Sequence, residues 1–254
     1  QRLGPAHLGL GAALGLDRLA VMPRTRGAVF SSGDELRAAG QPLSAGEIYD
    51  SNGPMLAALL ASEGITADRG PVLPDDPEAM LERLRESASG HDLLITCGGV
   101  SAGEKDHLPA LLQRHGRVHF WRVRIKPGMP VLLGELDGTL ILGLPGNPVA
   151  VMACFLVLGR RLIDRLEGAA NDRPRQFARL GQRIEKHHPR LEFMRGTLRS
   201  DPDGVLRVTP DSVTGSHRLA AASAANALIV VPEGPCDLAA DTVVAVLPFG
   251  AMAE

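Results

Sequence analysis

Cysteine is scarce in this chain of 254 residues, and the cysteines present are not arranged in pairs. Cys97, Cys154 and Cys236 lie far apart in the sequence, and none belongs to a Cys-x-x-Cys motif. The pattern supports neither a disulfide framework nor a zinc site made of cysteines. Reduced thiols are typical of the cytoplasm, so we expect a cytoplasmic protein.

The chain also lacks long hydrophobic runs and an excess of charge of one sign. Its longest apolar run, residues 149–158, is too short to span a bilayer and stops at Arg160 and Arg161. Twenty-seven basic and 29 acidic residues leave a formal net charge of −2. Because a basic surplus is what attracts nucleic acid and anionic lipid, we expect neither nucleic acid nor a membrane among the partners.

From residue 27 to about residue 168, short apolar runs alternate with helical patterns. This alternation predicts an α/β fold, with a mostly parallel sheet covered by helices on both faces. Asn52 and Asn147 each precede a helical pattern and are typical helix caps. The predicted strands are 27–31, 92–96, 118–125 and 139–142, and the predicted helices are 52–63, 76 onward, 106 or 107–114, and 147–166.

The helical period ends at a short polar linker, residues 169–174. Beyond it, short apolar runs alternate with Gly, Pro and Asp turns, which indicates a small all-β domain. We therefore divide the chain into an α/β domain at 26–168 and a β domain at 175–254. Residues 1–25 look like the end of a preceding portion, so we expect the chain to be a fragment of a longer protein.

Three predicted strands end in polar loops that contain glycine: residues 31–36, 96–106 and 143–148. Ligands of open parallel sheets bind beyond the carboxyl ends of the strands, so these loops are expected to converge on one cleft. The helix that begins after Asn147 favours an anion such as a phosphate. Asp34, Glu35, Glu104 and Asp106 offer oxygen ligands for a magnesium ion beside it, although exposed carboxylates are more often simply solvated.

Five other residues have functional and structural interpretations. Lys126, in the stretch KPGMP, is able to neutralise an oxyanion or to lie on the surface of a proline turn. Neither His187 nor His188 lies in a metal-binding motif, and both are predicted to face solvent. Trp121 is expected to pack within the protein. Cys97 has no histidine placed by the sequence to activate it, so a catalytic thiol is not predicted.

Taken together, the motifs resemble one known family. SSGDEL (31–36), EIYDSN (47–52), TCGGVSAGEKD (96–106), KPGMP (126–130) and GLPGNPVA (143–150) occur in the order and spacing of the molybdopterin molybdenumtransferase family, which includes MoeA and the gephyrin E domain. LEFMRG (191–196) and GSHRLAAASAANAL (215–228) resemble that family's C-terminal β barrel. The resemblance covers nearly the whole chain.

The resemblance implies an enzyme that takes adenylylated molybdopterin and molybdate as substrates, releases AMP and inserts molybdenum, with Mg²⁺ as cofactor. It implies a homodimer for the full-length protein, whereas we expect this chain alone to be a monomer. The residues it implies are Asp106, Glu35 and Asp34 for catalysis, with Asp106 and Glu35 near the metal; Gly98, Gly99, Ser101, Asp50, Asn52, Pro145, Gly146 and Asn147 for the pterin or adenylate; and Lys126, Pro130 and Arg195 for molybdate.

Three positions depart from the family pattern at the expected molybdate site. Met129 stands where the family has a second lysine, and Ala150 and Ala221 stand where it has serines. The loss of one cation and two hydroxyl donors is expected to weaken oxyanion binding. An alternative is therefore a degenerate paralogue, or a scaffold module, that binds a pterin or nucleotide without efficient metal transfer.

Overall fold

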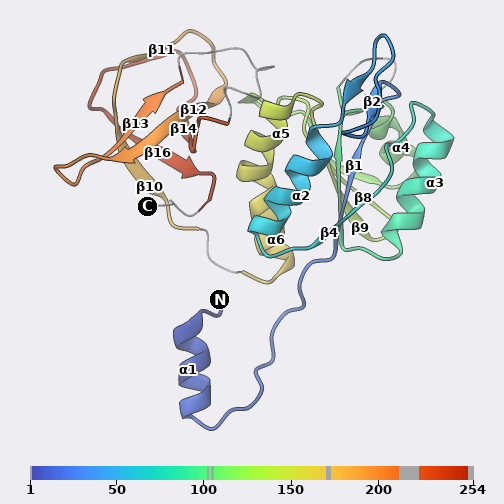
Figure 1. The fold of residues 1–254 in the computed structure, drawn as a ribbon, viewed down its shortest axis with the longest axis horizontal. Coiled ribbons are helices and arrows are strands. Elements are labelled where there is room, and N and C mark those ends of the chain that lie inside the picture. Colours follow the sequence, from blue (N-terminus) through green and yellow to red (C-terminus); the bar gives the residue numbers. More distant parts are fainter. Residues whose placement is uncertain (1, 102, 104–105, 170–172, 212–222, 251–254) are drawn as a thin grey trace.

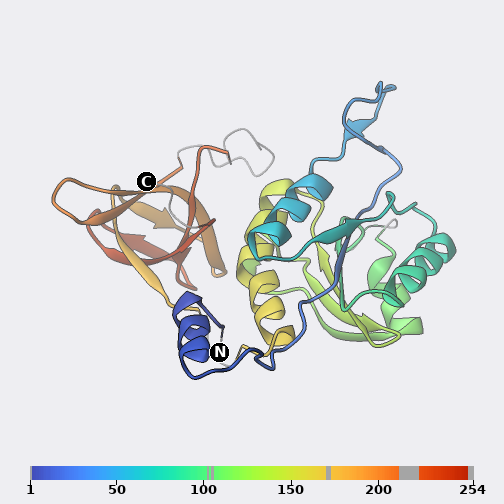
Figure 2. The same cartoon turned by 60° about the horizontal axis from the view of Figure 1, so that its bottom comes forward.

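The computed structural model describes residues 2–101, 103, 106–169, 173–211 and 223–250. Two sheet-containing regions lie side by side, and helix α1 (Pro5–Ala13) stands apart below them (Figure 1). Turning the molecule about the horizontal axis brings α1 toward the viewer (Figure 2). Within the described part of the chain, none of the helices is long and apolar enough to cross a membrane.

The first region is built on a six-stranded sheet of order β4-β1-β5-β9-β8-β6. Four neighbouring strands, β4, β1, β5 and β9, are parallel, while β8 and β6 continue the sheet with antiparallel pairings. The predicted α/β class is confirmed. The strands are β1 (Gly27–Ser31), β4 (Ala67–Arg69), β5 (Leu93–Cys97), β6 (Arg117–Trp121), β8 (Leu132–Leu136) and β9 (Thr139–Leu144).

Helices cover both faces of this sheet because its strands are apolar on both sides. On one face, Met80 and Leu84 of α3 (Pro77–Ala88) and Leu112 of α4 (Leu108–His115) pack against the sheet. On the other face, Leu56 and Leu60 of α2 (Asn52–Ser62) share a core with α5 (Pro148–Cys154), a π-helical turn (Phe155–Gly159) and α6 (Arg160–Leu166). All five residues of β1 and all five of β5 are buried, as expected for covered parallel strands.

Two predicted elements differ in detail from the structure. The single strand predicted at 118–125 is two strands, β6 and β7 (Ile125–Lys126), because the chain turns at Arg122, which has φ 66°. The long helix predicted from Asn147 does extend to Leu166, but a π-helical turn interrupts it. Strand β8, whose burial alternates residue by residue, was not among the predicted strands.

The second region is a small β barrel. Strands β13, β10, β16, β14 and β12 are neighbours in that order, and β13 also pairs with β12, so that the five strands close on themselves. The predicted C-terminal barrel is confirmed. Its strands are β10 (Gln176–Leu180), β12 (Leu191–Ser200), β13 (Leu206–Pro210), β14 (Ala227–Val231) and β16 (Val243–Pro248), and the smaller pairs are β11 (Ile184–Lys186) with β15 (Cys236–Leu238) and β2 (Leu36–Arg37) with β3 (Ile48–Tyr49).

The two regions share an apolar junction, and the first contributes one strand to the sheet of the second. Val149 and Met152 of α5 pack in one cluster with Phe193 of β12 and Leu228 of β14. Strand β7, which follows the first sheet's β6 in the chain, pairs with β12 of the barrel. The KPGMP segment therefore ties the barrel to the α/β region at the level of the glycine loops.

Candidate functional site

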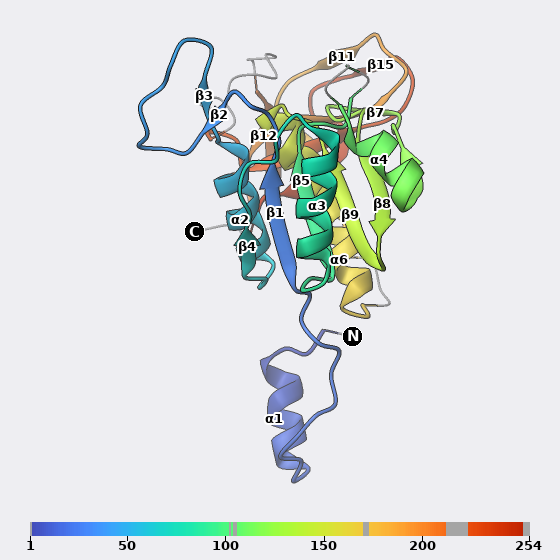
Figure 3. The same ribbon diagram turned by 90° about the vertical axis from the view of Figure 1, so that its right-hand side faces the viewer.

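A cavity of about 430 Å³ lies at the carboxyl ends of β1, β5 and β9. These strands run side by side in the same direction, so the loops that follow them meet at one end of the sheet (Figure 3). The structure thus brings together most of the predicted ligand residues. The cavity is lined by Ser32, Gly33, Glu35, Asp75, Gly98, Gly99, Val100, Ser101, Asp106, Pro130, Pro145, Gly146 and Asn147.

The glycines that follow β5 are required by their backbone conformation. Gly98 has φ 93°, and a Cβ atom there would lie 2.8 Å from the carbonyl oxygen of Ser32. Gly99 has φ 68°, also in the region that disfavours other residues. The two glycines let the loops after β1 and β5 approach each other closely, and they leave the backbone exposed to a ligand.

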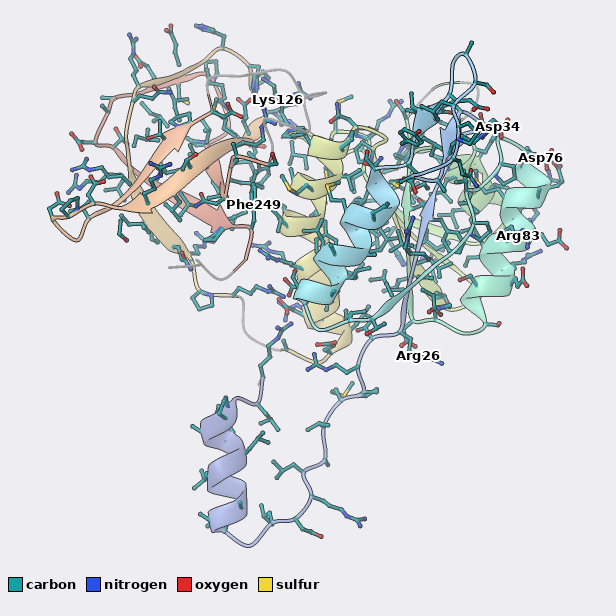
Figure 4. All side chains as sticks on the ribbon, in the orientation of Figure 1. Arg26, Asp34, Asp76, Arg83, Lys126 and Phe249 are labelled. Carbon is teal, nitrogen blue, oxygen red and sulfur yellow. The ribbon has the colours of Figure 1, made fainter. Side chains whose placement is uncertain are left out.

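Three carboxylates line the cavity: Glu35, Asp75 and Asp106. Asp106 accepts a hydrogen bond from the backbone N–H of Gly103 (2.8 Å), which fixes the loop after β5. Asp34 is not a lining residue; its carboxylate accepts from the backbone N–H of Asp75 (3.3 Å) and joins two loops. Figure 4 shows Asp34 at this end of the molecule.

Sequence reasoning missed Asp75 as a lining residue. It interpreted the Asp75–Asp76–Pro77 stretch only as the start of a helix, and Asp76 is indeed the cap, accepting from Ala79 N (2.8 Å). Asp76 lies at the upper end of α3 (Figure 4). Two adjacent aspartates before a helix were the available signal, because only one of them is needed as the cap.

Asn147 and Asn52 organise the loop after β9. The side chain of Asn147 accepts from the backbone N–H groups of Val149 (3.0 Å) and Ala150 (3.4 Å), so it caps α5 as predicted. Asn52 donates to the carbonyl oxygen of Gly146 (2.8 Å) and anchors this loop to α2. Asn52 therefore supports the cavity rather than lining it.

Asp50 does not line the cavity but lies in a polar cluster with Ser31 and Arg69. It accepts hydrogen bonds from Ser31 Oγ (2.8 Å) and Gly53 N (3.0 Å), and Arg69 Nη2 lies 3.7 Å from its other oxygen. Cys97 Sγ is 3.3 Å from Ser31 Oγ, and burial raises the pKa of this thiol to about 12. A thiol with so high a pKa is a poor nucleophile, in line with the prediction that Cys97 is not catalytic.

Trp121 supports the glycine loop from below. Its indole N–H donates to the carbonyl oxygen of Val100 (2.9 Å), and its ring packs against the core that includes Leu108. The guanidinium of Arg122 lies 4.7 Å from the centre of the ring. Trp121 packs within the protein, as predicted.

Lys126 lies on β7, outside the cavity lining, in a cluster with Glu192 and His188. Its Nζ is 2.9 Å from Glu192 Oε1 and 3.3 Å from His188 Nε2, and His188 Nε2 is 2.8 Å from Glu192 Oε2. The prediction that His188 faces solvent was wrong, because its side chain is only 25% exposed and bridges two strands. His187 is 82% exposed, as predicted.

The remaining positions predicted to bear on molybdate binding are Arg195 and the three departures from the family pattern, Met129, Ala150 and Ala221. Arg195 is buried and pairs with Asp211 (3.2 Å). It lies three residues from Glu192 on β12, and side chains at that spacing point to opposite faces of a strand. Met129 is half exposed and Ala150 is buried in the first turn of α5, whereas Ala221 lies outside the described residues.

Magnesium fits this cavity only with help from a ligand. Within the described ranges, the histidine, cysteine and acidic side chains form no group of three that could hold a metal ion. Glu35, Asp75 and Asp106 nevertheless present hard oxygen donors to one cavity. Because Mg²⁺ commonly binds one or two carboxylates plus substrate phosphates, the donor set suits a metal carried with a phosphate.

A larger cavity, of about 560 Å³, lies between α6 and the barrel, away from the glycine loops. Arginines line it, but Arg160 and Arg173 hydrogen-bond to Glu63 (2.7 and 2.6 Å), and Arg173 also binds Asp164 (2.7 Å). This cavity has neither the glycine loops nor the carboxylate donors of the smaller one. We therefore assign the functional site by its chemistry rather than by its volume.

The fold and the site define a class: an α/β domain with a glycine-lined cavity at the carboxyl ends of its parallel strands, followed by a β barrel. Residues 28–165 match the family described as "Probable molybdopterin binding domain", and residues 178–249 match "MoeA C-terminal region (domain IV)". The chain belongs to the molybdopterin-binding domain family and carries the MoeA C-terminal domain.

Named relatives agree with this assignment. The chain is 34% identical over 250 residues to a molybdopterin molybdenumtransferase of Haemophilus influenzae, covering 98% of this chain and 62% of the relative. It is 37% identical over 249 residues to molybdopterin molybdenumtransferase 2 of Mycobacterium tuberculosis, covering 95% and 61%. The chain thus spans about three fifths of the length of these relatives.

A solved structure shows the same architecture. The molybdopterin biosynthesis MoeA protein of Pyrococcus horikoshii superposes with a TM-score of 0.83 at 26% identity. The superposition covers 99% of this chain and 61% of that chain. The α/β sheet and the barrel therefore recur together in a solved relative.

Proposed function

We propose that this chain carries the substrate-binding part of a molybdopterin molybdenumtransferase, which inserts molybdenum into adenylylated molybdopterin with release of AMP. The observation that carries the proposal is the convergence of three polar loops on one cavity at the carboxyl ends of β1, β5 and β9. The names of the relatives support the same reaction class. Cytoplasmic location remains a prediction.

The cavity is suited to holding the phosphate groups of an adenylylated pterin. Gly98 and Gly99 leave the backbone free of side chains, so phosphate oxygens are able to approach main-chain N–H groups. Ser101 adds a hydroxyl, and the start of α5 at Asn147 adds the positive end of the helix dipole on the same wall, although the Asn147 side chain already accepts from the N–H groups of Val149 and Ala150. In the proposed complex these groups hold the phosphoanhydride while Glu35 and Asp106 face it.

The acidic residues have a defined role in this proposal. Glu35 and Asp106 would hold Mg²⁺ together with phosphate oxygens, and the ion would neutralise the charge on the phosphoanhydride. Asp106 is held by Gly103 N, so its second oxygen has a fixed position relative to the loop. Asp34 keeps the neighbouring loop in place through Asp75 N.

Molybdate would bind at the junction of the two regions, with Lys126 as the cationic residue and Pro130 on the cavity wall. Arg195, the other predicted cation, points to the opposite face of β12 and pairs with Asp211. Both cations belong to the barrel sheet, since β7 pairs with β12. Met129 and Ala150 supply no polar side chain there. A second candidate function follows from this: binding of the pterin or nucleotide without efficient molybdenum insertion.

The proposed dimer of the full-length protein draws support from α1. Leu8 and Leu10 of α1, and Leu14 directly after it, expose 57%, 61% and 69% of their surface, although leucine usually lies inside a folded protein. An apolar helix surface of this kind is suited to an interface.

Sedimentation of the full-length protein should show a dimer, and sedimentation of this chain should show a monomer at micromolar concentration. A tight dimer of this chain alone would contradict the second expectation.

Replacing Asp106 tests the proposed reaction. We expect Asp106→Asn in the full-length protein to slow AMP release from adenylylated molybdopterin by about a hundredfold, the size typical when one contact to developing charge is lost. The change removes one negative charge and keeps the shape of the side chain. AMP release is measured by chromatography under anaerobic conditions with magnesium and molybdate present.

The matched control is Asp203→Asn. Asp203 also accepts a hydrogen bond from a backbone N–H, that of Val205 (2.9 Å), but it lies in the turn between β12 and β13. The Asp203→Asn variant should release AMP at the wild-type rate. Equal rates for wild type and Asp106→Asn would remove Asp106 from the mechanism, whereas AMP release without molybdenum insertion by the wild type would favour the second candidate function.

A further inference from the structure

The cluster of Lys126, Glu192 and His188 has one carboxylate shared between two nitrogen groups. Lys126 on β7 and Glu192 on β12 are register partners in a parallel pairing, which places their side chains next to each other. Glu192 Oε1 binds the lysine and Glu192 Oε2 binds the imidazole. Each oxygen of this carboxylate therefore has a different nitrogen partner.

The geometry determines which nitrogen of His188 carries hydrogen. A carboxylate only accepts hydrogen bonds, so the 2.8 Å contact requires a hydrogen on His188 Nε2. Nδ1 is buried and has no hydrogen-bond partner within the described part of the chain. The His188 ring is therefore held through Nε2, and the shortest contact of this nitrogen is the one to Glu192.

The neighbouring cationic side chains, Lys186 and Arg190, donate hydrogen bonds to backbone carbonyl oxygens. Lys186 donates to the carbonyl oxygens of Arg190 and Pro232, and Arg190 donates to that of Ile125. Glu192 is only 11% exposed, so water does little to fix its orientation. The imidazole of His188 is the side chain that holds the Glu192 oxygen not used by Lys126.

We propose that His188 is a positioning residue for Lys126: it fixes the Glu192 carboxylate, which in turn holds the lysine ammonium where an oxyanion is bound at the domain junction. The inference rests on the proposed function, in which Lys126 contacts molybdate. It assigns a role to a residue that the sequence motifs leave out. It also identifies a support for the lysine of KPGMP, where Met129 supplies no second charge.

Two substitutions at one position separate a positioning role from simple packing. The amide nitrogen of glutamine reaches about as far along the side chain as Nε2, whereas that of asparagine reaches only as far as Nδ1. His188→Gln should therefore keep the hydrogen bond to Glu192, and His188→Asn should lose it. Both replace the ring by a neutral amide, so any packing loss is shared between them.

Molybdate affinity of the full-length protein, measured by calorimetry, gives the first readout. We expect His188→Asn to weaken binding about tenfold, near the lower limit for one hydrogen bond to a charged group, and His188→Gln to restore it to within about twofold. The KM for molybdate in the insertion assay should rise in parallel while kcat changes little. Equal weakening by both variants would overturn the proposal.

A double-mutant cycle gives the second readout. In a Glu192→Gln background, His188→Asn should have no further effect on molybdate affinity, because the residue through which it acts is gone. Additive effects would contradict the proposal. Wild-type protein that binds no molybdate would remove the proposed oxyanion site itself, an outcome distinct from a site that binds but ignores residue 188.

Discussion

The two ends of the parallel sheet carry different kinds of polar structure. At the amino end, carboxylates pair with arginines: Asp92 binds Arg26, and Glu63 binds Arg160 and Arg173. At the carboxyl end, the side chains of the cavity loops mostly bind backbone N–H groups, as Asp106 does with Gly103 and Asn147 with Val149. Asp50, which lies 3.7 Å from Arg69, is the exception already described. The first arrangement matches charges to one another, and the second anchors loops while leaving oxygens directed to a cavity.

The difference is visible in the acid–base properties of the amino end. Burial alone would raise the pKa of Glu63, but hydrogen bonds and attraction from Arg173 and Arg160 outweigh it and hold the pKa below its usual value. Hydrogen bonds from Arg26 lower the pKa of Asp92. Charges at this end therefore stabilise the fold, whereas Glu35, Asp75 and Asp106 at the carboxyl end line the cavity that we propose as the ligand site.

The largest expected effect on stability comes from breaking the amino-end network. Glu63→Leu would leave Arg160 and Arg173 without their shared partner, and the side chain of Glu63 is only 5% exposed. Loss of one partner from a buried ion pair typically destabilises by about 3–5 kcal/mol, and we expect the lower end of that range because both arginines keep other hydrogen-bond partners. Denaturant unfolding should show a loss of this size, while Glu185→Gln, which removes a half-exposed carboxylate, should change the free energy by less than about 0.5 kcal/mol.

Acid should weaken the same end of the molecule. Glu63, Asp92 and Asp164 all have a folded-state pKa below the usual value, so their stabilisation is present above the unfolded pKa of about 4. It is lost as the pH falls through the lower folded-state values. The free energy of unfolding should therefore decline below about pH 4, and more shallowly in Glu63→Leu; an identical slope in both proteins would contradict the assignment.

A smaller loss is expected at the carboxyl end. Asn147→Ala removes the oxygen that caps α5 and should lower the free energy of unfolding by about 1 kcal/mol, the usual contribution of a helix cap. Because the same side chain lines the cavity, ligand affinity should fall as well. Asn147→Asp provides the comparison: it retains the cap but places a negative charge where a phosphate is expected, so it should spare stability and still weaken binding.

The smallest expected effect is on thiol chemistry, and it requires no substitution. Burial raises the pKa of both Cys97 and Cys154 to about 12, whereas Cys236 is partly exposed. Iodoacetamide at pH 8 should label Cys236 of the native protein and leave the other two until the protein unfolds. Mass spectrometry of digested protein reads this directly, and rapid native labelling of Cys97 would show that the end of β5 is open.

Much of the site was predictable because parallel strands bring their following loops together. Strand order pointed to the loops at 31–36, 96–106 and 143–148, and the family resemblance implied Gly98, Gly99, Ser101, Asp106 and the 145–147 turn within them. The structure places all of these residues at one cavity. Sequence periodicity could not show that β7 leaves the first sheet, since the break depends on the backbone of one residue, Arg122.

The misplacement of His188 has a different cause. Its contacts come from register pairing between β7 and β12, whose members lie more than sixty residues apart in the chain. A polar histidine in a polar stretch carries no local sign of such a partner. Long-range contacts of this kind, like the support of the Val100 loop by Trp121, are set by the tertiary fold.

The most direct test of the account is to fill the cavity without disturbing the fold. A side chain at Gly146 would point into open space, with its Cβ no closer than 3.8 Å to Gly98 Cα, and Gly90 offers a similarly open position at the amino end. Calorimetry with adenylylated molybdopterin should show that Gly146→Leu in the full-length protein loses at least about a hundredfold in affinity, about 2.7 kcal/mol, while Gly90→Leu binds as the wild type does. Undiminished binding by Gly146→Leu would contradict the assignment of the cavity as the ligand site.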